Sequence, residues 1–178
     1  MRTKTTTNKF FDALRRNKKG FLWLLIPISA LLLAFVLNFF VILHVVVPSE
    51  SMEPTLKPGA LVVGSRLEYI NSEPEVGDVV IFRHEEFGEK LLIKRIVAVS
   101  GQRFEMKDGL VFVDGAKLDG TASEKDFKET VIPKGMVLVL GDNREESFDS
   151  RFWENPFVSV DNIKAKALFT YYPKIKGL

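Results

Sequence analysis

The sequence lacks cysteine altogether and contains only two histidines, His44 and His84, in 178 residues. The absence of cysteine excludes disulfides, zinc sites built on thiolates and a thiol nucleophile. His84 is the only histidine outside a long apolar run, so the general base that most hydrolases use is scarce here. The sequence shows neither a Cys/His cluster nor a phosphate-binding glycine loop, and we therefore expect neither a metal nor another cofactor.

Charge is missing from one long stretch. Residues 21–47 include no Asp, Glu, Lys or Arg over 27 consecutive positions. About 20 apolar residues in a helix cross the hydrocarbon layer of a membrane. The apolar core of a cleavable secretory signal is shorter, at roughly 7 to 15 residues. The run therefore predicts one retained transmembrane helix over residues 21–47.

The flanks of this run predict its orientation. Residues 1–20 carry seven basic side chains and one acidic side chain, and short basic flanks stay in the cytoplasm. Residues 48–178 hold the remaining 18 basic and 22 acidic residues, a net charge of −4. We expect an N-terminus in the cytoplasm, an anchor in contact with membrane lipid and an extracytoplasmic domain. An acidic domain does not favour binding to nucleic acid.

Short runs rich in β-branched residues follow at fairly regular spacing, separated by turn residues. This pattern predicts a mainly β, antiparallel domain over residues 48–178. Asp108-Gly109 is a strong hairpin signal inside a small hairpin and loop insertion that we place at residues 101–135. Its polar part, residues 114–128, is expected to be an exposed loop or small subdomain. Strands are expected at residues 60–64, 77–82, 91–99, 104–106, 110–113, 136–140 and 165–172.

Lys94 stands in the middle of the longest of these expected strands. Side chains alternate between the two faces of a strand, so Lys94 shares a face with Leu92 and Ile96, while Arg95 lies on the other face. If the first face packs against the core, the loss of hydration lowers the pKa of the ammonium group and makes Lys94 a candidate general base. The alternative is a solvated lysine on an edge strand.

Ser51 lies in a loop constrained by Pro48 and Pro54, directly after the apolar run. A serine hydroxyl becomes a good nucleophile when a neighbouring base accepts its proton, and Lys94 is the natural candidate for that base. Taken alone, a serine in a loop is usually a turn residue, and that interpretation stands beside the catalytic one. The polar cluster 141–151 has two interpretations as well: a solvated loop, or a set of acids and hydroxyls that hold a catalytic lysine in place.

Several motifs, in this order behind an anchor, resemble those of the type I signal peptidases of bacteria. The resemblance implies a β-rich catalytic core, similar to that of self-cleaving repressor proteases, with one N-terminal transmembrane helix. It also implies a serine endopeptidase that removes signal peptides from exported preproteins without a cofactor. The motifs are Ser49-Glu50-Ser51-Met52-Glu53-Pro54-Thr55-Leu56, Gly77-Asp78-Val79-Val80, Lys94-Arg95-Ile96-Val97, and Gly141-Asp142-Asn143-Arg144 followed by Ser147, Asp149, Ser150 and Arg151.

The resemblance also implies a role for individual side chains. Ser51 matches the nucleophile and Lys94 the general base of a Ser/Lys dyad. Ser49 matches a hydroxyl of the oxyanion hole, and Ser147 matches the hydroxyl that orients the lysine. The resemblance further implies ion pairs of Asp142 with Arg95 and of Asp149 with Arg151, and shallow substrate pockets lined by Val47, Met52, Leu56 and Ile93.

Two other functions remain open at this point. The first is a hydrolase that uses Ser51, His84 and either Asp142 or Asp149 as a triad. The second is a diverged, inactive relative that serves as a membrane-held binding or assembly factor. The altered turn at Ser100, where the family usually has a Gly-x-Pro-Gly-Asp type turn, gives this second alternative some support, whereas the retention of both Ser51 and Lys94 counts against it. The sequence does not indicate an oligomeric state or which preproteins are cut.

Overall fold

The computed structural model describes residues 18–119 and 126–178, and the chain divides into two units, residues 1–41 and 42–178. The basic arm expected at residues 1–20 lies almost wholly outside the described residues. In the first unit, helix α2 (Lys18–Val36) continues as a π-helical segment, η1 (Leu37–Val41). The stretch Trp23–Val41 is long and apolar enough to cross a membrane.

The end of the apolar run is a strand, which differs from the single helix expected over residues 21–47. Residues Ile42–Val46 form β1 and pair antiparallel with β2 (Leu61–Ser65). Apolar periodicity does not separate a membrane helix from a strand that follows it directly, and the β-branched residues Val45 and Val46 favour the strand. The helical part of the run therefore ends at Val41.

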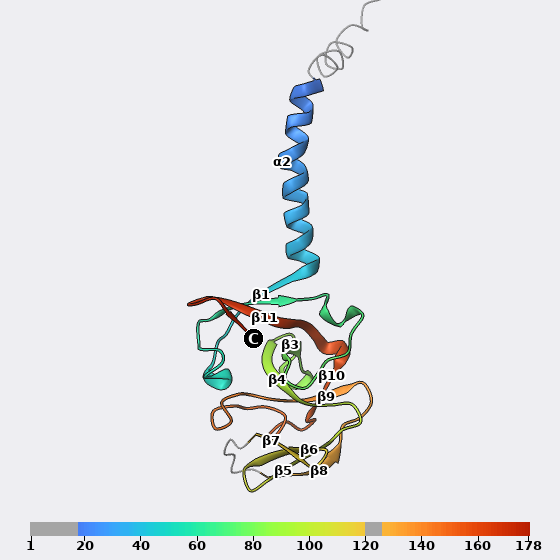
Figure 1. Cartoon of the computed structure of the whole chain (residues 1–178), viewed down its shortest axis with the longest axis vertical. Coiled ribbons are helices and arrows are strands. Elements are labelled where there is room, and N and C mark those ends of the chain that lie inside the picture. Colours follow the sequence, from blue (N-terminus) through green and yellow to red (C-terminus); the bar gives the residue numbers. More distant parts are fainter. Residues whose placement is uncertain (1–17, 120–125) are drawn as a thin grey trace, which may run out of the picture. The chain divides into compact units, whose positions relative to one another are not determined.

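The second unit confirms the expected antiparallel β fold (Figure 1). Its larger sheet has eight strands among the described residues, in the order β1-β2-β11-β3-β4-β9-β10, with β12 paired to β11. Every pairing in it is antiparallel. Besides β1 and β2, the strands are β3 (Val79–Arg83), β4 (Leu91–Val99), β9 (Met136–Leu140), β10 (Phe157–Ser159), β11 (Ile163–Tyr172) and β12 (Lys176–Gly177).

A smaller sheet occupies the region expected as an insertion. Its order is β7-β6-β5-β8, and Figure 1 shows it at the end of the unit opposite β1 and β11. Asp108 and Gly109 join β5 to β6 with positive φ angles of 51° and 75°, as a type I′ hairpin requires. Of the polar stretch 114–128, expected as an exposed loop or small subdomain, residues 116–119 form β7 and residues 127–128 begin β8, while residues 120–125 lie outside the described residues. The strands are β5 (Arg103–Lys107), β6 (Leu110–Val113), β7 (Ala116–Asp119) and β8 (Phe127–Val131).

Strand β4 connects the three hydrophobic clusters of the core. Its residue Ile93 belongs to the cluster that includes Val62 of β2 and contacts Val45 of β1, and Ile96 belongs to the cluster around Phe82 and Trp153. Val97 and Ala98 belong to the third cluster, which includes residues of the smaller sheet. Because β4 is packed on both faces, the side chains that it carries have well-defined positions.

The turn that departs from the family pattern is well formed. Ser100 Oγ donates a hydrogen bond to the carbonyl oxygen of Met136 and accepts one from the amide of Gly135. Gly101 supplies the positive φ of 84° that the turn needs. The altered sequence at Ser100 therefore leaves the end of β4 attached to β9.

Candidate active site

Ser51 and Lys94 are in direct contact. Lys94 comes from β4, and Ser51 comes from the short 3-10 turn η2 (Glu50–Met52). Lys94 Nζ lies 2.5 Å from Ser51 Oγ, and only 6% of Lys94 and 5% of Ser51 are exposed. The structure thus brings together the two residues that the sequence analysis singled out. Burial of Lys94 also argues against the solvated edge lysine.

The surroundings of Lys94 favour its neutral form. Burial lowers the pKa of Lys94 from 10.5 to about 8; the nearby carboxylates of Asp149 and Asp142 raise it, and Arg151 lowers it further. At pH 7 this change increases the neutral fraction from roughly 1 in 3,000 to roughly 1 in 10. An amine in this state is able to accept a proton from a hydroxyl that it already contacts.

Ser49 provides a second hydroxyl beside the nucleophile. Its Oγ lies 3.2 Å from Ser51 Oγ, and either hydroxyl is able to donate in this contact. Ser49 precedes the η2 turn with extended backbone, at φ −137° and ψ 168°. This position is close enough to offer a donor to an oxygen bound next to Ser51.

The loop after β9 holds the turn that carries Ser51. The amide nitrogen of Asn143 donates to the carbonyl oxygen of Ser51 over 3.1 Å, and Asn143 Nδ2 donates to the carbonyl oxygen of Glu50 over 3.2 Å. Gly141 allows the close approach, because a Cβ there would lie 2.4 Å from the Ser51 carbonyl oxygen and 2.2 Å from Ser147 Oγ. Both residues belong to the Gly141–Arg144 motif, but their contacts with the Ser51 turn were not predicted.

A buried ion pair between Asp149 and Arg151 stabilises the loop after β9. Arg151 Nε lies 2.7 Å from Asp149 Oδ1, and the two side chains are 1% and 0% exposed. Asp149 Oδ2 also accepts a hydrogen bond from the amide of Gly141 over 2.9 Å. Arg151 donates further to the carbonyl oxygens of Arg144 and Ser147. The expected pair is therefore present, and it bonds to the backbone of three other loop residues, Gly141, Arg144 and Ser147.

The second expected ion pair is present on the opposite face of β4. Arg95 donates from Nε and Nη2 to the two oxygens of Asp142, over 2.8 Å and 2.6 Å. Burial alone raises the pKa of the Asp142 carboxyl, but hydrogen bonds from Arg95 and Thr55 outweigh it and lower that pKa. This bidentate contact fixes the loop after β9 to β4 at the residue that follows Lys94.

Ser147 does not make the contact with Lys94 that the resemblance implied. Its side chain is buried next to Gly141, and its Oγ has no hydrogen-bond partner among the described residues. The hydroxyl lies within the loop that holds Ser51 but is not bonded to the lysine. The position of this side chain depends on the packing of the loop and is therefore not readable from the motif.

A cleft with a volume of about 500 Å³ opens beside Ser51 and Lys94. Of the four side chains expected to line substrate pockets, only Ile93 lines it. Val47, Met52 and Leu56 are at most 1% exposed and belong to the core layer that also contains Ile93. They support the cleft rather than form its surface. The lining residues are Val45, Val46, Pro48, Ser49, Ser51, Ile81, Lys90, Leu91, Leu92, Ile93 and Lys94.

Two strand edges near this cleft lack a partner among the described residues. Strand β4 pairs with β3 at positions 91–95, but its pairing with β9 begins only at Arg95. The other side of residues 91–94 is therefore unpaired. Strand β1 pairs with β2 alone and forms an edge of the larger sheet. Exposed edges of this kind are able to bind an extended peptide by main-chain hydrogen bonds.

His84 is engaged elsewhere, which argues against a Ser/His/Asp triad. Its Nε2 lies 3.0 Å from the carbonyl oxygen of Asn155, and its Nδ1 accepts a hydrogen bond from the amide of Glu86. Its ring packs against Trp153 with 4.3 Å between the ring centroids. Both ring nitrogens are thus occupied, and Ser51 Oγ contacts Lys94 and Ser49 instead.

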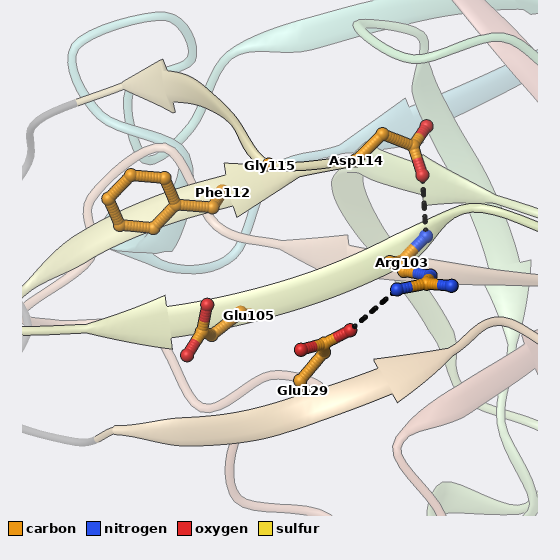
Figure 2. A pocket seen from close by; sticks show the side chains of 6 residues that line it. All are labelled: Arg103, Glu105, Phe112, Asp114, Gly115 and Glu129. Carbon is orange, nitrogen blue, oxygen red and sulfur yellow. Dashed lines mark hydrogen bonds and ion pairs between the residues drawn. The ribbon is translucent and has the colours of Figure 1, made fainter.

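A separate hollow on the smaller sheet has no comparable chemistry (Figure 2). Arg103 is 3.4 Å from Glu129 in a solvent-exposed ion pair, and its backbone amide donates to Asp114. The remaining lining residues are Glu105, Phe112 and Gly115. None of these side chains is a hydroxyl or an amine able to attack a peptide bond, so the Ser51 cleft is the better candidate.

Comparison with known proteins shows the family of this chain. Residues 21–172 match the family model described as "Signal peptidase, peptidase S26". A protein named "Probable signal peptidase I-1" from Synechocystis sp. is 36% identical over 155 residues, with 81% of this chain and 78% of that protein covered. Signal peptidase IB from Staphylococcus aureus is 32% identical over 173 residues, with 85% and 88% covered.

A crystal structure of a signal peptidase I from Enterococcus faecalis aligns with 53% of this chain and 97% of that chain, at 25% identity and a TM-score of 0.46. The family model covers most of the chain, including both residues of the Ser51–Lys94 contact. The chain therefore belongs to the signal peptidase family, peptidase S26.

Proposed function

We propose that this protein is a membrane-anchored serine endopeptidase that removes signal peptides from exported preproteins, with Ser51 as nucleophile and Lys94 as general base. The observation that carries the proposal is the 2.5 Å contact between the buried Lys94 Nζ and Ser51 Oγ. Membership of the signal peptidase family supports the reaction class.

The first step is the formation of an ester. The neutral amine of Lys94 accepts the hydroxyl proton of Ser51 while Ser51 Oγ attacks the carbonyl carbon of the bond to be cut. Burial of Lys94 contributes here because it lowers the pKa of the ammonium group. Asn143 and Gly141 keep the backbone of Ser51 in place during the attack.

Negative charge then develops on the carbonyl oxygen of the substrate. Preorganised donors beside this oxygen stabilise the tetrahedral intermediate. The Ser49 hydroxyl and the backbone N–H of Ser51 are the donors that we assign to this role. The position of Ser49 Oγ, 3.2 Å from Ser51 Oγ, supports the assignment.

The remaining steps return the enzyme to its starting state. The ammonium of Lys94 gives its proton to the amine of the leaving peptide as the C–N bond breaks, which leaves an acyl group on Ser51. Neutral Lys94 then takes a proton from water, and the hydroxide so formed attacks the ester carbonyl. As the bond to Ser51 Oγ breaks, the ammonium of Lys94 returns this proton to Ser51 Oγ, and the signal peptide leaves with a free carboxyl terminus. The same lysine serves both half-reactions, as one general base does in other acyl-transfer enzymes.

Substrate binding follows from the two unpaired edges at the cleft. An extended cleavage segment is able to add main-chain hydrogen bonds to residues 91–94 of β4 and to β1, while the walls of the cleft select the side chains. The walls are mostly aliphatic, with Val45, Leu92 and Ile93 among them. Small apolar residues next to the cut suit such a surface.

We further propose that the N-terminus is cytoplasmic and that the catalytic unit is extracytoplasmic. The seven basic residues of positions 1–20 support this orientation. The apolar helix ends at Val41, ten residues before Ser51 in the sequence. A preprotein likewise carries its cut directly after its own apolar segment.

The function is tested with the full chain in a neutral detergent and a preprotein whose signal ends in Ala-x-Ala. We expect a single cut after that motif, and we expect Ser51→Ala and Lys94→Ala each to abolish it. Lys57→Ala is the matched control, because Lys57 is exposed and does not line the cleft. Cleavage that survives Lys94→Ala at near-full rate would show that Lys94 is not the base.

A further inference from the structure

The cleft contains a second ammonium group that the proposed reaction does not use. Lys90 and Lys94 are the only charged residues among those that line the cleft. Lys94 is buried against Ser51, whereas Lys90 is exposed and has no ion pair with a described residue. A nearby basic residue, Arg83, already pairs with Glu89 over 2.6 Å. Lys90 therefore offers an unpaired positive charge to whatever occupies the cleft.

The spacing along the chain places Lys90 relative to the cut. Lys90 comes one residue before β4 and four residues before Lys94. At about 3.3 Å per residue, the two lysines are roughly 13 Å apart along the strand direction. An extended peptide paired with the free edge of residues 91–94 also rises by about 3.3 Å per residue. The peptide residue beside Lys90 is therefore about four residues away from the peptide residue that Ser51 attacks.

The opposite wall of the cleft indicates which side of the cut this is. That wall runs from Val45 and Val46 through Ser49 to Ser51, where it meets Lys94. Lys90 adjoins Leu91, which packs against the same hydrophobic cluster as Val45, so we place Lys90 at the Val45 and Val46 end of the cleft. The preprotein residues before the cut follow an apolar membrane segment, as β1 follows η1 in this chain, so they enter the cleft at that end.

We infer that Lys90 gives the enzyme a charge preference at the fourth and fifth residues before the cut, with acidic side chains favoured and basic side chains disfavoured. The inference rests on the proposed function of the Ser51 cleft. An exposed ion pair of this kind changes rates modestly, by about 2- to 5-fold for each unit of charge. The effect weakens as salt screens the two charges.

The test uses three versions of one preprotein that carry Glu, Gln or Lys at the fourth residue before the cut, with Ala-x-Ala unchanged. The full chain is assayed in neutral detergent, which keeps anionic lipid out of the experiment. We expect kcat/KM to fall in the order Glu, Gln, Lys for the wild-type enzyme. We expect Lys90→Gln to remove the order and Lys90→Glu to reverse it, with Lys57→Gln as the control that keeps it.

The outcomes separate this inference from the proposed function. If all three preproteins are cut with equal kcat/KM, or if Lys90→Gln keeps the wild-type order, the role of Lys90 is wrong while the protease assignment stands. A charge preference confined to residues after the cut would also overturn the role of Lys90, because the peptide would then bind in the opposite direction. If no version is cut, the proposed function itself fails.

Discussion

The amide nitrogen of Asn143 donates a 3.1 Å hydrogen bond to the carbonyl oxygen of Ser51, across 92 positions of sequence. The same residue reaches the carbonyl oxygen of Glu50 with its side chain. These two bonds connect the loop after β9 to the turn that carries the nucleophile. The position of Ser51 Oγ therefore depends on a loop that contributes no reacting atom.

Replacing Asn143 tests this connection. Asn143→Ala removes the bond to Glu50 and keeps the backbone bond to Ser51. One hydrogen bond contributes about 0.5–1.5 kcal/mol, so we expect kcat to fall by about 2- to 10-fold with little change in KM. We expect Asn143→Asp to lower kcat further than Asn143→Ala does, because a carboxylate would face the Glu50 carbonyl oxygen. Equal kcat for wild-type and Asn143→Asp enzymes would contradict a positioning role.

Gly141 is predicted to tolerate no side chain. A methyl group there would overlap the Ser51 carbonyl oxygen and Ser147 Oγ, so Gly141→Ala must displace the nucleophile turn. A displacement of about 1 Å in such a site costs on the order of 100-fold in rate. Single-turnover kinetics on a preprotein measure the loss. Gly177→Ala is the control, since a Cβ at Gly177 meets nothing within 4 Å and should leave the rate unchanged.

The buried pair of Asp149 and Arg151 is predicted to stabilise the fold. Asp149→Ala leaves the Arg151 guanidinium buried without its carboxylate, which typically destabilises a protein by about 3–5 kcal/mol. The exposed pair of Arg83 and Glu89 offers a comparison, and Glu89→Ala should cost less than about 1 kcal/mol. Urea unfolding of each detergent-solubilised variant, followed by tryptophan fluorescence, measures the two losses in the free energy of unfolding. Similar midpoints for the two variants would count against the structural role of Asp149.

The pH dependence of cleavage follows from the lowered pKa of Lys94, which is about 8. Only the neutral amine accepts a proton, and the neutral fraction grows as the pH rises through that pKa. We therefore expect kcat/KM to increase about tenfold per pH unit below pH 8 and to level off above it. Initial rates between pH 6 and pH 10 provide the curve. An inflection near pH 6.5, the usual range of histidine, would point to a different base.

The sequence was sufficient for the parts of the site that depend on local pattern. Alternation along a run of β-branched residues predicted β4 and put Lys94 and Arg95 on opposite faces, as the structure has them. The ion pairs of Asp142 with Arg95 and of Asp149 with Arg151 were predicted from the motif resemblance and are present. The Asp149–Arg151 pair joins residues two positions apart, whereas the Asp142–Arg95 pair spans 47 positions and was predictable only from the motif resemblance.

The features that the sequence did not predict depend on tertiary contacts. Val47, Met52 and Leu56 are apolar whether they line a pocket or fill the core, and only the packing of β1 and β2 places them inside. Strand β1 has the composition of the membrane run that precedes it. The bonds of Asn143 with the Ser51 turn form only when β9 is in the sheet, so no local pattern reveals them.

The most direct test of the Ser51–Lys94 dyad is covalent labelling by a serine-directed penem, followed by intact-mass measurement and peptide mapping. We predict one acyl adduct on Ser51 in the wild-type chain, none in Ser51→Ala, and at most a trace in Lys94→Ala. We expect the same labelling of Ser51 in His84→Ala, which would show that the histidine is not required. An adduct on another residue, or full labelling of Ser51 without Lys94, would contradict the proposed mechanism.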